Sequence, residues 1–195
     1  MAVTPDLVIK VRDGLFLAPS RTYAEQYVEP LVRERYELLE PGGGDHDAVG
    51  TDGTKYEIKS SKVLHPAGNG KGSKTLIDRI LFESDHHVTK RLVPFNEHKS
   101  ADYLANIQNV KRDHFEVLIY VLLFEDCVKV FFANATDISK GKFPSWSDKH
   151  GRYDAHGKSG QFPITKATID WHIQHHLVDT ITYTEVAEIF ERLSI

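Results

Sequence analysis

The chain has a single cysteine, Cys127, among its 195 residues. One cysteine excludes an internal disulfide and is typical of proteins in a reducing cytoplasm. Because Cys127 lies in an apolar stretch, we expect it to be a small core residue rather than a reactive thiol.

Long hydrophobic runs are also missing. The most apolar segment, 115–124, contains Glu116 and is too short to cross a bilayer. The first residues lack the basic and apolar regions of an export signal. We therefore expect a soluble cytoplasmic protein that has no membrane partner.

The chain has no excess of positive charge, since its formal net charge is −4. That value argues weakly against a non-specific nucleic-acid binder. The charge is unevenly distributed, however, because the segment 55–74 is rich in lysine and has Glu57 as its one acid. A negatively charged protein can still hold DNA through one basic strip. Net charge therefore does not exclude a DNA partner.

The composition, with 41% hydrophobic and 27% charged residues, predicts a single globular domain. The first clear helix is predicted over 23–39, with a bend at Pro30. Thr22 and Glu25 have the spacing of a capping box at its start. The run Pro-Gly-Gly-Gly at 41–44 predicts its end.

Beyond this helix, two β-hairpins are predicted, the first from 47–49 with 55–60 and the second from 117–124 with 127–133. A short helix is expected over 103–110, loops over 65–74 and 140–160, and a last helix over 184–193, where Thr182 and Glu185 again form a capping-box pattern. The order of elements indicates a mixed β-sheet flanked by helices. We expect the α/β class, with α+β as the alternative.

The first hairpin carries the residues that are chemically capable of catalysis. Glu57 and Lys59 share one face of the second strand, opposite Tyr56 and Ile58. A three-residue loop, 51–53, would set Asp47 directly across from Glu57, whereas loops of two or four residues would turn Asp47 to the other face. Gly53 favours the three-residue loop, which ends in the left-handed region.

Two carboxylates and a lysine that converge are what metal-assisted phosphodiester hydrolysis requires. As bare residue types on one strand face, they are also common on solvated surfaces. The whole run decides between these interpretations. Asp47-Ala48-Val49, three residues, Gly53, two residues and then Tyr56-Glu57-Ile58-Lys59-Ser60 resembles the catalytic core of the PD-(D/E)xK nuclease superfamily, and in particular its PvuII-like type II restriction endonucleases.

The resemblance is close over about fifteen residues. It implies a restriction-endonuclease-like fold in which Asp47 and Glu57 hold Mg²⁺, one or two ions per site, and Lys59 lies at the attacking water. No small-molecule cofactor is implied. The chain departs from the pattern in two ways: it is longer between Leu64 and His98, and His46 replaces the proline that often precedes the first aspartate.

The function that the resemblance implies is hydrolysis of double-stranded DNA at a short palindromic site, leaving 5′-phosphate ends. A homodimer would straddle the site, with an N-terminal helical dimerisation region over about 15–44 and a catalytic, DNA-binding core over about 45–195. The alternatives are a structure-specific or DNA-repair nuclease of the same superfamily, a catalytically dead DNA-binding module, and a protein that binds no nucleic acid. The intact Asp47, Glu57 and Lys59 argue against a dead site.

Other residues are secondary candidates. Glu25 is either an additional active-site carboxylate or simply the capping partner of Thr22. His172 and His176, four apart, suggest zinc, but no third ligand adjoins them, so surface or interface histidines are the better interpretation. Candidate DNA contacts, chosen for their positive charge or paired donors and acceptors, are Lys62, Lys71, Lys74, His86, His87, Asn96, His156, Lys158, Ser159 and Gln161.

Overall fold

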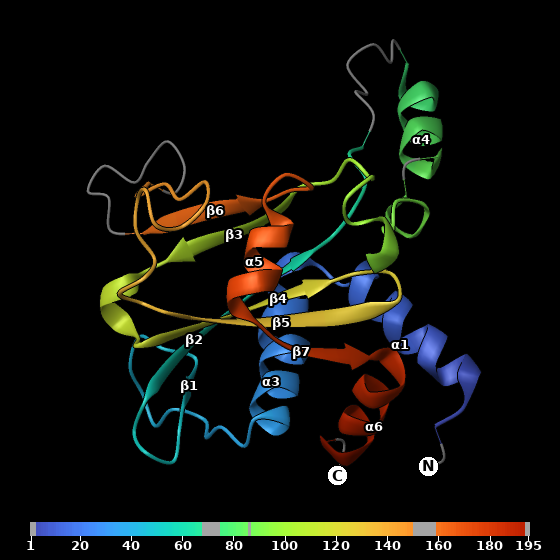
Figure 1. The fold of residues 1–195 in the computed structure, drawn as a ribbon. Coiled ribbons are helices and arrows are strands. Elements are labelled where there is room, and N and C mark those ends of the chain that lie inside the picture. Colours follow the sequence, from blue (N-terminus) through green and yellow to red (C-terminus); the bar gives the residue numbers. More distant parts are fainter. Residues whose placement is uncertain (1–2, 68–74, 86, 150–158, 194–195) are drawn as a thin grey trace.

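The computed structural model describes residues 3–67, 75–85, 87–149 and 159–193. In this part of the chain, a five-stranded sheet has the order β1-β2-β4-β5-β7, and a separate two-stranded sheet pairs β3 with β6 (Figure 1). Strands β2 and β4 run parallel and the other neighbours run antiparallel. The strands are β1 (Ala48–Val49), β2 (Lys55–Lys62), β3 (Ala105–Val110), β4 (Val117–Leu123), β5 (Cys127–Asn134), β6 (Gly160–Ile164) and β7 (Leu177–Thr182).

Helices cover both faces of the larger sheet, so the expected mixed α/β architecture is present (Figure 1). One face packs against α1 (Pro5–Leu17), α3 (Glu29–Arg35) and α6 (Tyr183–Leu193). The other face packs against α5 (Ile169–His176) and the β3–β6 pair. The remaining helical segments are α2 (Ser20–Tyr23), a π-helical turn η1 (Ala24–Val28), α4 (Leu76–Asp85), η2 (Val88–Lys90), η3 (Phe95–Glu97) and η4 (Arg112–His114).

Strand β4 separates two hydrophobic cores. Leu118, Tyr120 and Leu122 belong to the core beneath α5 and the β3–β6 pair, whereas Ile119 and Val121 belong to the core beneath α1, α3 and α6. Alternate side chains of a strand point to opposite faces, so a strand that is apolar throughout is buried on both sides. The predicted hairpin of 117–124 with 127–133 is confirmed, and Cys127 is buried as expected.

The helical stretch from Ser20 to Arg35 differs from the prediction at both ends. It starts before Thr22 and stops at Arg35 rather than at 39, so Thr22 lies inside the helix and the Thr22–Glu25 capping box is wrong. A π-turn precedes Pro30, with the Glu29 backbone N–H donating to the Ala24 carbonyl. The turn has a physical cause, because proline has no N–H for the regular helical bond.

Helix α1 was not expected from the sequence, although its start carries two recognisable signals. Thr4 caps it, with its hydroxyl oxygen accepting a hydrogen bond from the Leu7 backbone N–H at 3.3 Å, and Pro5 occupies the first helical position. In the described part of the chain, no helix is long and apolar enough to cross a membrane.

The expected helix over 103–110 is wrong, because this segment forms β3. Ala105 and Ile107 are fully buried while Asn106 between them is not, which is the period of a strand. Pairing with β6 supplies backbone partners that local sequence does not reveal. Asn109, at a φ of 57°, lies in a register shift that returns Val110 to the core.

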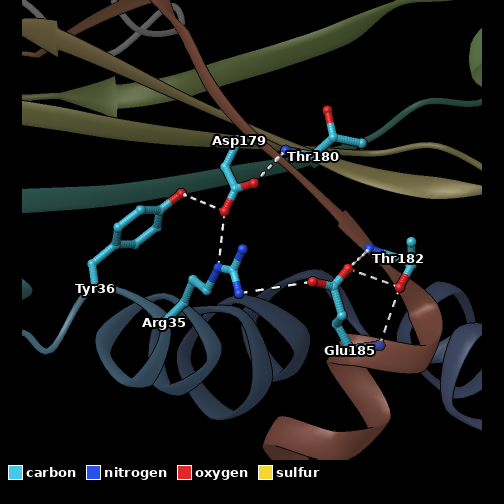
Figure 2. A network of polar contacts seen from close by, with 6 residues as sticks. All are labelled: Arg35, Tyr36, Asp179, Thr180, Thr182 and Glu185. Carbon is cyan, nitrogen blue, oxygen red and sulfur yellow. Dashed lines mark hydrogen bonds and ion pairs between the residues drawn. The ribbon is translucent and has the colours of Figure 1, made fainter.

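A polar network anchors α3 and α6 to β7 (Figure 2). Asp179 accepts hydrogen bonds from the Arg35 Nε at 2.9 Å and the Tyr36 hydroxyl at 3.4 Å. Arg35 also forms an ion pair with Glu185 at 3.8 Å. These contacts hold the C-terminal end of α3, and the same helix carries Glu29 at its other end.

The predicted capping box at the start of α6 is confirmed (Figure 2). The Thr182 hydroxyl oxygen accepts from the Glu185 backbone N–H at 3.2 Å, and the Glu185 carboxylate accepts from the Thr182 backbone N–H at 2.8 Å. Both donors would otherwise lack a partner at the helix start.

We expect Thr182→Ala to lower the free energy of unfolding by about 1 kcal/mol, because the cap is lost. Thr182→Ser keeps the hydroxyl and should stay close to the wild type. Urea unfolding measures both variants. An alanine variant as stable as the wild type would contradict this role of Thr182.

Candidate active site

The first hairpin has the register that places its polar residues together. Ala48 pairs with Tyr56 and Val49 with Lys55, and the same register continued by one residue sets Asp47 across from Glu57. The Gly50 N–H donates to the Thr54 carbonyl at 2.8 Å, which closes the three-residue loop, and Gly53 has a φ of 86°. The predicted loop length is therefore confirmed.

Lys59 lies between the two carboxylates. Its Nζ is 2.5 Å from Glu57 Oε1 and 3.2 Å from Asp47 Oδ2. Asp47 Oδ2 also accepts the backbone N–H of Ile58 at 2.8 Å, so this carboxylate is fixed to the strand as well as to the lysine. The three residues that the sequence selects converge on one point.

Burial and charge oppose each other in this cluster. Burial lowers the pKa of Lys59, but the carboxylates of Glu57 and Asp47 outweigh it, so the pKa lies above its usual value. Burial raises the pKa of Glu57, against the opposing effect of Lys59. The lysine is therefore charged at neutral pH. Held in this way, it is a hydrogen-bond donor and a positive charge rather than a base.

One oxygen of the cluster lacks a partner. Glu57 Oε2 is buried without a hydrogen bond among the described residues, which is costly for a carboxylate unless a cation or water meets it. The described residues contain no group of three or more His, Cys, Asp or Glu side chains placed to hold a metal. Magnesium needs only one or two protein carboxylates, because water and substrate complete its shell. Asp47 and Glu57 fit that requirement.

A second pair of carboxylates comes from the helix opposite β2. Glu25 lies within the π-turn and Glu29, four residues later, directly follows it, and both line the cleft beside Lys59. The sequence interpretation included Glu25 but missed Glu29. The four-residue spacing from Glu25 was the available signal, since residues that far apart share a helix face.

The surroundings of Glu29 disfavour the charged form of its carboxylate. Burial is the largest cause that raises its pKa, to about 7, and the nearby charge of Asp47 raises it further, while Lys59 and Arg33 act in the opposite direction. Arg33 is 3.7 Å from the Glu29 carboxylate and donates to the Asp47 carbonyl at 3.3 Å. Arg33 thus ties α3 to the hairpin and keeps Glu29 close to the cluster.

These elements enclose a cleft of about 570 Å³. One wall is the helix with Glu25 and Glu29, the floor is β2 from Ile58 to Lys62, and the opposite wall includes β3. Lys62 lines the cleft, but its Nζ also donates to the carbonyls of Phe16 at 2.9 Å and Ala18 at 2.6 Å. Burial lowers the pKa of Lys62 to about 8. This lysine therefore closes the C-terminal end of α1 in addition to any contact with a ligand.

The other candidate DNA contacts that the structure describes do not line this cleft. Within the described residues, His87 caps η2, Asn96 is exposed on η3, and Gln161 lies on β6, where its backbone pairs with Ser147. Ser159 directly precedes β6. Five candidates lie outside the described residues: Lys71, Lys74, His86, His156 and Lys158.

The histidines of α5 have a structural environment rather than that of a metal site. His172 is fully buried, and its Nδ1 is 2.9 Å from the Tyr120 hydroxyl. Burial lowers the pKa of His172 to about 3, which keeps the ring neutral. His176 Nδ1 is 2.9 Å from the Phe132 carbonyl. Both rings pack among aromatic side chains, including Phe143. The interpretation as surface or interface histidines is wrong for His172, which is buried, whereas His176 is half-buried.

Comparison with protein-family models and with curated proteins finds no match for this chain. What the protein does is therefore inferred from its own residues and their geometry.

We expect Glu29→Gln to stabilise the protein at pH 8 in chelator. Between the ordinary carboxyl pKa of 4.5 and the raised value of about 7, the folded state keeps a proton that the unfolded chain has released. Stability therefore falls as the pH rises through this window. The glutamine variant escapes that loss and should exceed the wild type by up to about 3 kcal/mol at pH 8.

Near pH 4.5 the two proteins should be nearly equal in stability, as urea unfolding at both pH values would show. Glu188→Gln, on the exposed side of α6, is the matched control and should leave stability unchanged at both pH values. A constant difference between Glu29→Gln and the wild type would count against a buried, protonated Glu29.

Proposed function

We propose that the protein is a metal-dependent deoxyribonuclease of the type II restriction class. The observation that carries the proposal is Lys59 held between Asp47 and Glu57 at the edge of a cleft, in the same run of residues that resembles PD-(D/E)xK nucleases. A solvated strand face does not require a buried carboxylate, whereas Glu57 is only 6% exposed. Its burial favours a functional role over a surface pattern.

The electrostatics of the cleft support a requirement for a divalent cation. In and beside the cleft, four carboxylates (Glu25, Glu29, Asp47 and Glu57) stand against three cations (Lys59, Lys62 and Arg33). When all four carboxylates are ionised, a phosphodiester would therefore meet a net negative charge. Magnesium held by Asp47 and Glu57 would supply positive charge opposite the phosphoryl oxygens. Cation binding should therefore precede or accompany tight binding of DNA.

The protein's own groups have separate roles in the proposed hydrolysis. Lys59 donates a hydrogen bond toward the attacking water or a phosphoryl oxygen and remains charged. The Ile58 N–H and Arg33 hold Asp47 in place. Glu29 is a further carboxylate near the water, and its raised pKa suits a group that exchanges protons near neutral pH. The expected products are a 5′-phosphate and a 3′-hydroxyl.

Cleavage of phage and plasmid DNA with magnesium tests this function. We expect discrete bands from the wild type, none in chelator, and at least a hundredfold loss of rate in Lys59→Ala and in Glu57→Gln, because each removes charge or a ligand at the reacting phosphate. Lys55→Ala, at an exposed position of the same strand, is the control and should cut normally.

Melting curves would show that the variants are folded. A smear of fragments would favour a repair or structure-specific nuclease instead. Absence of cleavage in the wild type would contradict the proposed function, and tight DNA binding without cleavage would favour a binding module.

The protein is further proposed to act as a homodimer through its N-terminal region, so that each subunit cuts one strand. Apolar side chains exposed in that region support the proposal: Leu17 is 51% exposed and Tyr27 is 38% exposed. Helix α4 has a comparable apolar face, with Ile77 and Ile80 exposed by 68% and 65%, and extends away from the sheet (Figure 1).

We expect the double variant Leu17→Glu/Tyr27→Glu to sediment at the chain mass of 22.1 kDa and the wild type at twice that mass. Buried charge would oppose the apolar contact. The double variant should also nick plasmid rather than linearise it. The matched variant Ile77→Glu/Ile80→Glu locates the contact: if it alone dissociates the dimer, the interface lies on α4. A monomeric wild type would contradict the dimer.

A further inference from the structure

The wall of the cleft formed by β3 carries two side-chain amides that no step of the proposed hydrolysis uses. Asn106 and Gln108 both line the cleft that Glu25 and Glu29 also line. They are two residues apart on a strand and therefore share a face. Ile107 between them is fully buried in the core, so the amide face is the one directed away from that core.

Asn106 is held in place but incompletely bonded. Its backbone N–H donates to the Ser61 Oγ on β2 at 3.1 Å, which fixes β3 against the floor of the cleft. Its side-chain Oδ1 is buried and has no hydrogen-bond partner among the described residues. A buried acceptor without a donor is costly in a folded protein, so such an atom indicates a missing partner.

The chemistry of the amide restricts what that partner is. Phosphate oxygens only accept hydrogen bonds, so a DNA backbone does not satisfy Oδ1. The exocyclic amino groups of adenine and cytosine are donors on the base edge. Gln108 is exposed and supplies a further donor and acceptor beside Asn106. A side-chain amide makes its best paired contact with adenine, through N6 and N7.

The pair of strands that carries these amides has a shape suited to contacting DNA bases. Strand β3 pairs antiparallel with β6, and a two-stranded ribbon fits the major groove of B-form DNA. Gln108 lies within the register shift between Ile107 and Val110. Such bulges bend a strand and redirect its side chains.

We propose that Asn106 and Gln108 read an amino-bearing base, adenine before cytosine, next to the phosphodiester that the Asp47–Glu57–Lys59 cluster cuts. This inference rests on the proposed nuclease function. It makes β3, rather than the predicted contact residues alone, a determinant of the cleavage site.

Cleavage of a randomised DNA duplex with magnesium, followed by sequencing of the ends, tests the proposal. Asn106→Leu and Gln108→Leu remove the amides while nearly keeping side-chain size. We expect each to reduce the preference for adenine or cytosine at one position of the site by about tenfold or more, since a paired amide contact of this kind is lost. Gln174→Leu, an exposed amide on α5, is the control and should keep the wild-type site.

The outcomes separate this inference from the function on which it rests. If the wild type cuts at a defined site and both leucine variants keep the full preference, β3 does not read the base and the nuclease function still stands. Cleavage by the wild type without base preference also overturns the inference. If the wild type cuts no DNA, both the function and the inference fail. Gln108 is exposed, so its variant carries the test even if Asn106→Leu does not fold.

Discussion

Strand β4 is buried on both faces. The neighbouring strands and the helices must cover both of its faces, and this requirement determines where they lie. Antiparallel β5 continues the apolar sheet on one side, while parallel β2 occupies the other side. Strand β2 is apolar at Ile58 and polar at Glu57 and Lys59, which places charged residues at the margin of a buried sheet. Lys59 offsets part of the cost of burying these charges, because it lies within hydrogen-bond distance of both carboxylates.

Two elements distant from β2 in sequence complete the same cleft. The π-turn before Pro30 brings Glu25 and Glu29 to one wall, and β3 brings Asn106 and Gln108 to the other. Arg33 ties α3 to the hairpin. On β2, Ser61 holds β3 and Lys62 holds the end of α1. The two carboxylates around Lys59 would repel an anionic ligand unless a cation were bound first.

Predictions from local sequence patterns were correct where contacts between residues close in sequence determine the structure. The three-residue turn at Gly53, the hairpin of β4 with β5, the capping box at Thr182 and the burial of Cys127 are all confirmed. Predictions were wrong where contacts with residues distant in sequence determine the structure. The segment 103–110 forms a strand because β6 pairs with it, and Thr22 lies inside a helix whose start the capping pattern misplaced. Glu29 was overlooked because its proximity to Asp47 depends on the packing of α3 against the hairpin.

The sequence by itself determined the candidate cluster, since the alternation of a strand and the length of one turn suffice to bring Asp47, Glu57 and Lys59 to one face. These are local constraints that act within thirteen residues of chain. Only the tertiary structure decided that Glu57 is buried with an unpartnered oxygen, that Lys59 is flanked by two carboxylates, and that Glu29 and Asn106 line the same cleft. Burial and charge coupling arise between elements far apart in sequence, so no pattern within one segment encodes them.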